Sequence, residues 1–195
     1  MREILMQFLS EFDELNENQV QDLANNLEII EIKKDNILVH EGEVCNVCYF
    51  VLKGCLHQYI LKDGAEKTIG IYTESQAVNY YSDTGEKQKS ESFLTSIEDS
   101  VLLIGKPEKD KELYSRFPVL AEITRNMIEA DFGETQKTLA KYITSSPEER
   151  YLNILNERPD LFQRVPQYII ASFLGVTPES LSRIRKRLVK KQKNN

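Results

Sequence analysis

The sequence predicts an α+β protein in which an antiparallel β-roll comes first, a long helix follows, and a helix-turn-helix ends the chain. Three observations favour this order. Short apolar runs separated by turn residues fill the N-terminal half, and many closely spaced strands are typical of a sandwich or roll. A helical pattern of about 28 residues then lies between Pro118 and Pro147. Near the C-terminus, a glycine separates two short amphipathic helices.

The N-terminal half begins with a predicted helix and continues with predicted strands. Asn16 and Gln19 have the spacing of a capping box, which marks the start of a helix. The apolar face of that helix consists of Val20, Leu23, Ala24 and Leu27. The predicted strands are residues 27–32, 37–39, 47–52, 56–61, 66–72, 93–97 and 101–104. Asp63-Gly64 between two of them predicts a tight hairpin, because both central residues of such a turn take positive φ. The polar residues 79–92 are expected to leave the roll.

The long helix carries two apolar stripes. One stripe advances alternately by four and three residues, as a coiled-coil seam does, and it consists of Ile128, Phe132, Thr135, Leu139 and Tyr142. The other stripe is formed by Leu120, Ile123 and Met127. One stripe can pack on the β-roll while the seam faces a second subunit; alternatively, both stripes are buried within one chain. The length of the helix favours the first arrangement and therefore a homodimer.

The C-terminal helix-turn-helix is predicted from residues 165–188. Pro166 suits the first turn of one helix, and Gly175 ends that helix where a left-handed residue is needed. Thr177 can cap the second helix, with Pro178 at its first position. The periodicity turns Leu181, Ile184 and Leu188 inward. It leaves Glu179, Ser182, Arg183 and Lys186 facing outward.

The charge distribution indicates that the C-terminal end of the chain binds double-stranded DNA. Residues 150–195 carry a net charge of +7, whereas the first 149 carry −13. Because the N-terminal turns of a helix in the major groove meet base edges, Arg183 can pair with guanine and Glu179 with cytosine, while Ser182 reaches a base or a phosphate. The predicted phosphate contacts are Thr177, Arg185, Lys186, Arg187 and Lys190. The alternatives are a helical hairpin with a solvated charged face, or a basic tail that binds RNA or protein.

Four stretches resemble the Crp/Fnr family of transcription regulators, in particular its compact Bacteroidetes-type members. They are residues 40–43 (HEGE), 49–54 (YFVLKG), 62–64 (KDG) and 175–184 (GVTPESLSRI). The resemblance implies a cyclic-nucleotide-binding-like jelly roll at 1–118, a dimerisation helix at 119–145 and a DNA-binding helix-turn-helix at 146–195. It also implies a palindromic operator, RNA polymerase as a partner, and base reading by Glu179, Ser182 and Arg183. The wing of this winged-helix-like domain is expected to be reduced, because residues 158–165 are too few for a hairpin.

The sequence departs from the cyclic-nucleotide binders of this family. These proteins hold the nucleotide phosphate with a Gly-Glu turn and an Arg-Ser/Thr pair, and the matching positions here are residues 76–79 and Lys89-Ser90. No arginine lies between Arg2 and Arg116, and a lysine supplies a point charge without a bidentate fork. We therefore expect no response to cyclic AMP. The alternative is a sensor whose unidentified effector contacts Asn79, Tyr80, Tyr81, Lys89 and Ser90.

Neither a metal, a cofactor nor an enzymatic activity is predicted. Cys45 and Cys48 have metal-ligand spacing, but no second pair accompanies them. No cysteine precedes Cys45, whereas the oxygen sensors of the family hold an iron–sulfur cluster through an N-terminal cysteine group. The sequence contains no Gly-rich phosphate loop and no nucleophile elbow. No apolar run reaches the roughly 20 residues that span a bilayer, and the acidic N-terminus is unlike a signal peptide, so a cytoplasmic location is expected.

Overall fold

The computed structural model describes residues 1–80 and 89–193, with side chains to residue 190. Contacts divide the chain into two compact units. The first comprises Met1–Gln58 and Ile71–Gly133, and the second comprises Tyr59–Gly70 and Glu134–Asn195. The tip of one β-hairpin therefore belongs with the C-terminal helices.

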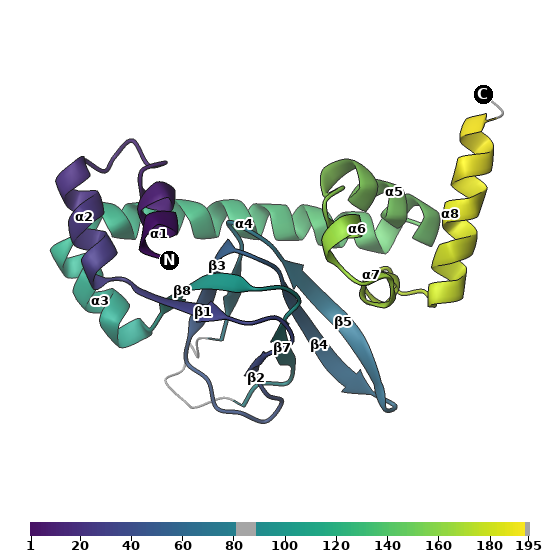
Figure 1. Ribbon diagram of the computed structural model, residues 1–195, viewed down its shortest axis with the longest axis horizontal. Helices are drawn as coiled ribbons and strands as arrows, with labels where there is room; N and C mark the ends of the chain where they lie inside the picture. The colour runs from purple at the N-terminus through teal and green to yellow at the C-terminus, as the bar shows by residue number, and fades with distance from the viewer. Residues whose placement is uncertain (81–88, 194–195) are drawn as a thin grey trace. The chain divides into compact units, whose positions relative to one another are not determined.

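The β-roll consists of two four-stranded sheets, as the sequence predicts (Figure 1). One sheet has the order β1-β8-β3-β6, and the other β2-β7-β4-β5. The strands are β1 (Glu28–Ile32), β2 (Ile37–Val39), β3 (Cys48–Lys53), β4 (Leu56–Lys62), β5 (Ala65–Tyr72), β6 (Ala77–Asn79), β7 (Phe93–Ser96) and β8 (Ser100–Gly105). Every predicted strand is present, and β6 is an addition that pairs with β3.

The sheet that contains β8 is covered on both faces. Leu102 belongs to the core between the two sheets, together with Val39, Leu56 and Leu94. Its neighbour Leu103 packs against a second core formed by helices. Successive side chains of a strand point to opposite faces, so the continuous apolar run of β8 fits a strand that is buried on both sides.

Several turns of the roll contain residues with positive φ, among them the turn at Asp63-Gly64 and the turn at Gly54. Asp63 and Gly64 have φ of 53° and 73°, which confirms the predicted hairpin turn between β4 and β5. Gly54, between β3 and β4, has φ of 110° and lies directly against Ser100. Its N–H donates to the Glu74 carboxylate over 2.8 Å.

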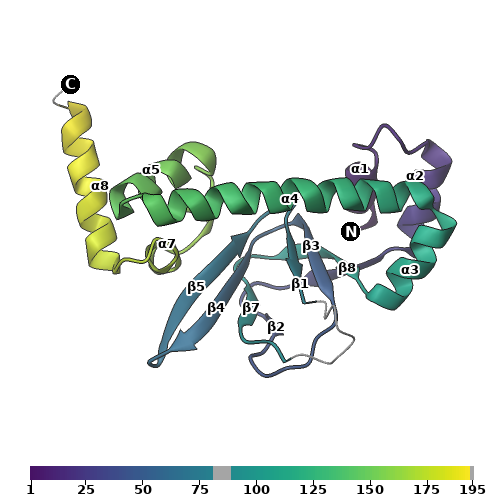
Figure 2. The same ribbon diagram turned by 180° about the vertical axis from the view of Figure 1, so that it is seen from behind.

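Four helices border the roll in the first unit (Figure 2). They are α1 (Arg2–Leu9), α2 (Glu17–Asn26), α3 (Pro107–Arg116) and the first half of α4 (Pro118–Thr144). The capping box of Asn16 and Gln19 is present at α2. The shared core of these helices contains Leu5, Leu9, Leu23, Leu113, Leu120 and Ile123. The stripe that begins at Leu120 thus packs inward, which both predicted arrangements require.

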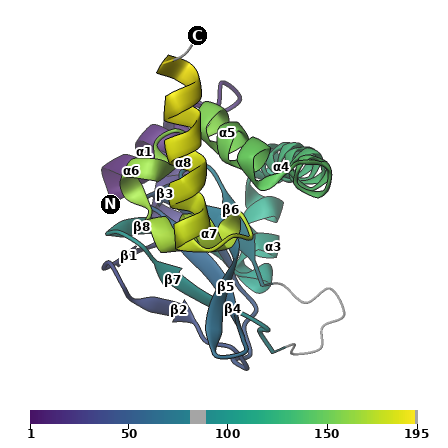
Figure 3. The same cartoon turned by 90° about the vertical axis from the view of Figure 1, so that its right-hand side faces the viewer.

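The C-terminal helices form a separate small core. They are α5 (Pro147–Glu157), α6 (Leu161–Arg164), α7 (Gln167–Phe173) and α8 (Pro178–Lys193). Helix α7 crosses α8 near the N-terminal end of α8 (Figure 3). Their buried side chains include Tyr151, Leu161, Ile169, Ile170, Leu174, Leu181 and Ile184. The connection of residues 158–166 holds α6 and no strand, which agrees with a reduced wing. Pro166 immediately precedes α7 rather than lying in its first turn as predicted.

Within the second unit, α7 binds the open edge of β5. The backbone N–H of Thr68 donates to Ser172 Oγ over 2.9 Å, and this hydroxyl donates to the carbonyl of Glu66 over 3.3 Å. The outer strand of a sheet presents unpaired backbone groups, and here a serine hydroxyl satisfies two of them.

Candidate nucleic-acid interface

The turn between α7 and α8 has the geometry of a helix-turn-helix. Gly175 has φ of 72°, in the region that favours glycine, and the N–H of Val176 returns to the carbonyl of Ala171 over 2.9 Å. Thr177 Oγ1 then accepts from the N–H of Ser180 over 3.2 Å. Thr177 therefore caps α8 and Pro178 begins it, as the sequence predicts.

One face of α8 is buried and the opposite face is open. Leu181 and Ile184 are 2% and 6% exposed and hold the helix on the C-terminal core, with Leu188 half-buried beside them. The three predicted base-reading residues, Glu179, Ser182 and Arg183, are all exposed. They lie in the first two turns of α8, which is where a helix in the major groove presents side chains to base edges.

Glu179 is ionised at neutral pH. A hydrogen bond from its own backbone N–H and a second from the Thr177 hydroxyl lower the pKa of its carboxyl group, and the Arg183 cation adds to this effect. A carboxylate at a helix N-terminus is also favoured by the helix dipole. The group is therefore an acceptor, as contact with the amino group of cytosine requires.

The predicted phosphate-binding residues differ in their availability. Arg185, Lys186 and Lys190 are exposed on α8. Arg187 is exposed too, but its Nη1 lies 3.0 Å from Glu148 Oε2, so it pairs with α5. The hydroxyl of Thr177 already caps α8. The sequence pattern did not reveal the Arg187–Glu148 pair, because the two residues come from separate helices.

The predicted seam of α4 is exposed along its whole length. Ile128, Phe132 and Leu139 are 63%, 62% and 58% exposed, and Thr135 and Tyr142 are exposed as well. Met127, by contrast, packs with Leu120 and Ile123 against the helical core. The alternative in which both stripes are buried within one chain is therefore wrong. A row of large apolar side chains that no described part of the chain covers is typical of an interface.

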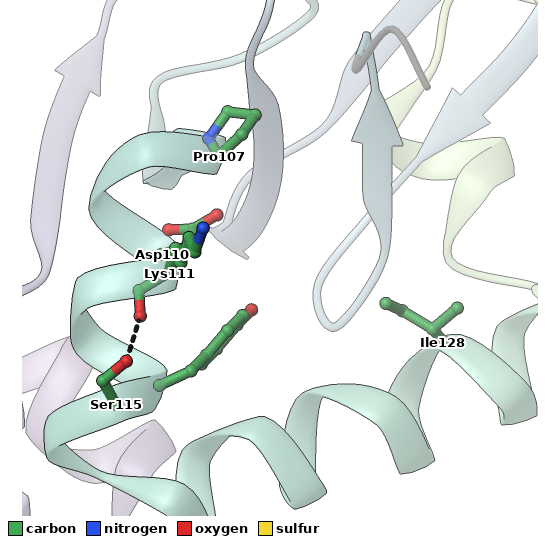
Figure 4. Close-up of a pocket in the computed structure, with 6 residues that line it drawn as sticks. Pro107, Asp110, Lys111, Ser115 and Ile128 are labelled. Carbon is green, nitrogen blue, oxygen red and sulfur yellow. Dashed lines mark hydrogen bonds between the residues drawn. The ribbon is translucent and has the colours of Figure 1, made fainter. Parts of the chain in front are cut away.

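An open depression adjoins this seam between α3 and α4 (Figure 4). It is lined by Pro107, Asp110, Lys111, Tyr114 and Ser115 of α3 and by Ile128 of α4. The hydroxyl of Ser115 donates to the carbonyl of Lys111 in its own helix over 2.9 Å. The lining is that of an ordinary helix surface, and Ile128 makes it continuous with the seam.

Hydrogen bonds link polar side chains inside the roll. Gln58 Nε2 donates to the hydroxyls of Tyr80 and Ser92 over 3.2 and 2.9 Å. The Tyr72 hydroxyl donates to Gln58 Oε1 over 2.8 Å, and burial raises the pKa of Tyr72 to about 12. The hydroxyl of Ser90 donates to the carbonyl of Ser92 over 2.7 Å. We call Gln58, Tyr72, Tyr80, Ser90 and Ser92 the roll network.

The residues of the predicted effector pocket are only partly brought together. Tyr80 and Ser90 belong to the roll network. Asn79 is exposed at the end of β6, and Lys89 is exposed where it pairs with Val44. Tyr81 lies outside the described residues. The described residues of this group include no arginine, and the neutral side chains of the network are hydrogen-bonded to one another.

The cysteines do not form part of a metal-ligand cluster in the described structure. Burial raises the pKa of the Cys48 thiol to about 11, and the pKa of Cys45 is also raised, mainly by burial. Cys55 is fully buried. Within residues 1–80 and 89–193, no three side chains of His, Cys, Asp or Glu lie together as metal ligands would.

The burial of His57 is expected to make the stability of the protein depend on pH. Its side chain is 3% exposed, and burial lowers its pKa from 6.5 to about 4. Between these two values the unfolded chain binds the proton that the folded chain rejects, so stability falls as the pH drops through this window, by about 3 kcal/mol in total. Urea unfolding at pH 7 and pH 4.5 measures this loss.

The matched variants for this test are His57→Gln and His40→Gln, since His40 is exposed. We expect His57→Gln to lose less stability than the wild-type protein between the two pH values, and His40→Gln to follow the wild type. Equal pH dependence in all three proteins would contradict the role of His57.

No helix in the described part of the chain is long and apolar enough to cross a bilayer.

Comparison with known proteins places the fold. Residues 29–115 match the cyclic nucleotide-binding domain family. No curated protein matches the sequence. A mutant of CooA from Carboxydothermus hydrogenoformans is 15% identical with a TM-score of 0.69, and the match covers 96% of this chain and 84% of CooA. The c-di-GMP responsive global regulator CLP from Xanthomonas campestris is 16% identical with a TM-score of 0.67, and the match covers 91% of this chain and 93% of CLP.

A transcriptional regulator of the Crp/Fnr family from Eubacterium rectale is 22% identical with a TM-score of 0.63, covering 91% of this chain and 86% of that one. At these identities the likeness to solved structures establishes the fold alone. Residues 29–115 match the cyclic nucleotide-binding domain family, and nearly the whole length of the chain has the fold of the Crp/Fnr transcription regulators.

Proposed function

We propose that this protein is a transcription regulator that binds a palindromic DNA site as a homodimer. The observation that carries the proposal is the open face of α8. Glu179, Ser182 and Arg183 are exposed in its first two turns, while Leu181 and Ile184 hold the opposite face on a buried core. This arrangement presents an acceptor, a hydroxyl and a bidentate donor to the edges of bases in a major groove.

Pairing of two chains through the seam of α4 supplies the second recognition helix. Two-fold symmetry then requires half-sites about one DNA turn apart, roughly 34 Å. Arg185, Lys186 and Lys190 contribute salt-dependent affinity for phosphates, which positions the protein without selecting a sequence. The proposed domains are 1–118, 119–145 and 146–195, and the regulator acts in the cytoplasm, where RNA polymerase is the partner expected at the operator.

The regulator does not respond to cyclic AMP in this proposal. The roll network satisfies its own hydrogen bonds, and residues 3–115 contain no arginine to grip a phosphate. Displacing buried polar groups from their partners costs free energy that a ligand must recover. Binding to the selected DNA should therefore be unchanged when cyclic AMP is added, and tighter binding would show that the roll senses the nucleotide.

In vitro selection from random duplex DNA tests the function directly. The purified protein is expected to enrich a two-fold symmetric sequence, which would demonstrate base reading and pairing together. Enrichment of an unsymmetric sequence would contradict the dimer, and no enrichment at moderate salt would leave only nonspecific binding.

Two variants separate base reading from phosphate binding. Arg183→Ala is expected to weaken binding to the selected site by about 1–3 kcal/mol, because a bidentate pair with guanine is lost, and to change binding to random DNA little. Lys190→Ala should weaken binding to both duplexes alike and reduce its salt dependence. Fluorescence anisotropy titrations of both duplexes at several salt concentrations measure these effects. If Arg183→Ala weakens both duplexes equally, Arg183 contacts phosphate rather than a base.

A further inference from the structure

Arg150 connects the end of α4 to the turn that precedes α8. Its guanidinium carbon lies 4.1 Å from the centre of the Tyr142 ring, and its Nε donates to the carbonyl of Ser145 over 3.1 Å. Its Nη1 donates to the carbonyl of Leu174 over 2.9 Å. One side chain of α5 thus joins the C-terminal end of α4 to the C-terminal end of α7.

The Leu174 contact is a specific one. The last carbonyls of a helix lack partners within that helix, and Leu174 directly follows the last residue of α7. A charged donor at such a carbonyl makes a stronger hydrogen bond than a neutral one. A lysine could supply the charge there, but it could not also keep the planar stack on Tyr142 and a second hydrogen bond to Ser145.

Gly175, which follows Leu174, is closely surrounded, so the turn between α7 and α8 has little room to move. A Cβ on Gly175 would lie 2.9 Å from the Tyr142 hydroxyl and 3.4 Å from Arg150 Nη1. The turn is therefore in close contact with the same two side chains, and α8 begins three positions later at Pro178. Displacement of this turn would carry the start of α8 with it.

We propose that Arg150, stacked on Tyr142, is a positioning residue that fixes the DNA-reading helix relative to the pairing helix and so sets the half-site spacing. The inference rests on the proposed function, since Tyr142 belongs to the seam and α8 is the helix that reads bases. Arg150 itself touches no DNA in this proposal. In a symmetric dimer, any rotation of α8 about the end of α4 occurs twice and changes the separation of the two reading helices.

A spin-label measurement tests the positioning without DNA. Labels are attached through unnatural amino acids at two exposed positions, Lys137 on α4 and Val189 on α8, so that the native cysteines stay in place. Dilution with excess unlabelled protein leaves one labelled chain per dimer. The wild-type protein should give a narrow distance distribution and Arg150→Met a broad one. Arg150→Lys should give an intermediate width, and Tyr142→Phe, which keeps the ring, should stay close to wild type.

A spacing series tests the consequence for DNA. The selected half-sites are placed at the optimal separation and at separations one base pair shorter or longer. Arg150→Met is expected to bind the optimal site at least about tenfold more weakly, because a charged hydrogen bond and a ring stack are both lost. It should lose less at the altered separations, so its spacing profile is flatter. The preference at each base should remain that of the wild type.

The outcomes distinguish this inference from the proposed function. If Arg150→Met gives a distance distribution as narrow as that of the wild type and an unchanged spacing profile, the positioning role is overturned. The proposal that α8 reads bases would still stand. A broad distance in that variant supports the role even if wild-type protein selects no DNA sequence, in which case the proposed function fails instead. If Arg150→Met does not fold, Arg150→Lys decides: wild-type width and profile would contradict the inference.

Discussion

A chain in which Phe132 and Leu139 are both replaced by glutamate is expected to be monomeric. The two side chains are 62% and 58% exposed, and in a symmetric pair four of them would leave water together. Full burial of each is worth about 1.5–3 kcal/mol, so even partial burial contributes several kcal/mol to association. Four added carboxylates would also face one another across the seam. The dimer should weaken by on the order of 10³-fold or more, and sedimentation velocity over a concentration series measures it.

The control for this variant adds the same charge elsewhere on the helix. Ala130→Glu combined with Lys137→Gln changes two exposed positions that lie away from the seam, since each residue advances about 100° around an α-helix. This chain should remain a dimer. A seam variant that sediments like the wild type would show that the two chains pair through another surface, and the proposed half-site geometry would then be wrong.

Gly54→Ala is expected to destabilise the roll severely. Its φ of 110° is strained for a residue with a Cβ, and the added carbon would lie 2.7 Å from Ser100 Cα. Ser100 belongs to β8 in the double-covered sheet, so its backbone cannot move aside without disturbing both cores. Strain and overlap together should cost about 3–5 kcal/mol, which urea unfolding at neutral pH measures.

Gly64→Ala provides the comparison, because it separates backbone strain from overlap. Gly64 has φ of 73°, but a Cβ there would meet nothing within 4 Å. Its replacement should cost only about 1–2 kcal/mol, the usual penalty for a left-handed conformation. Equal losses in the two variants would mean that the contact with Ser100 is relieved at little cost.

Local signals carried most of the fold prediction. The capping box at Asn16 and the Asp63-Gly64 turn are formed by neighbours in the sequence, and both are present in the structure. The helix α1 has no side-chain cap and begins at the second residue, so it offered no start signal. The start of α3 was signalled by Pro107 alone, because the sequence of this helix is highly charged and buries a single leucine. Strand β6 has three residues and is defined by its pairing with β3, which periodicity cannot reveal.

Some residues of the candidate site could likewise be predicted from local signals, and others could not. Helical periodicity alone places Glu179, Ser182 and Arg183 opposite the buried face of α8, and the structure leaves all three exposed. The roll network could not be predicted, because Gln58 bonds to residues 14, 22 and 34 positions away. The link from Arg150 to Leu174 likewise spans 24 positions. Contacts of this kind follow from the packing of elements, which a single sequence does not specify.

The hydroxyl of Ser172 has a consequence for anyone who builds chimeras of this protein. Residues 59–70 belong by chain order to the roll, yet their tip is hydrogen-bonded to α7 through Glu66 and Thr68. Exchanging the C-terminal half for that of another regulator would leave this hairpin against a foreign helix and free its outer edge to recruit strands from other molecules. A graft that transfers the hairpin tip together with the helices keeps the hydrogen bonds between Ser172 and the hairpin.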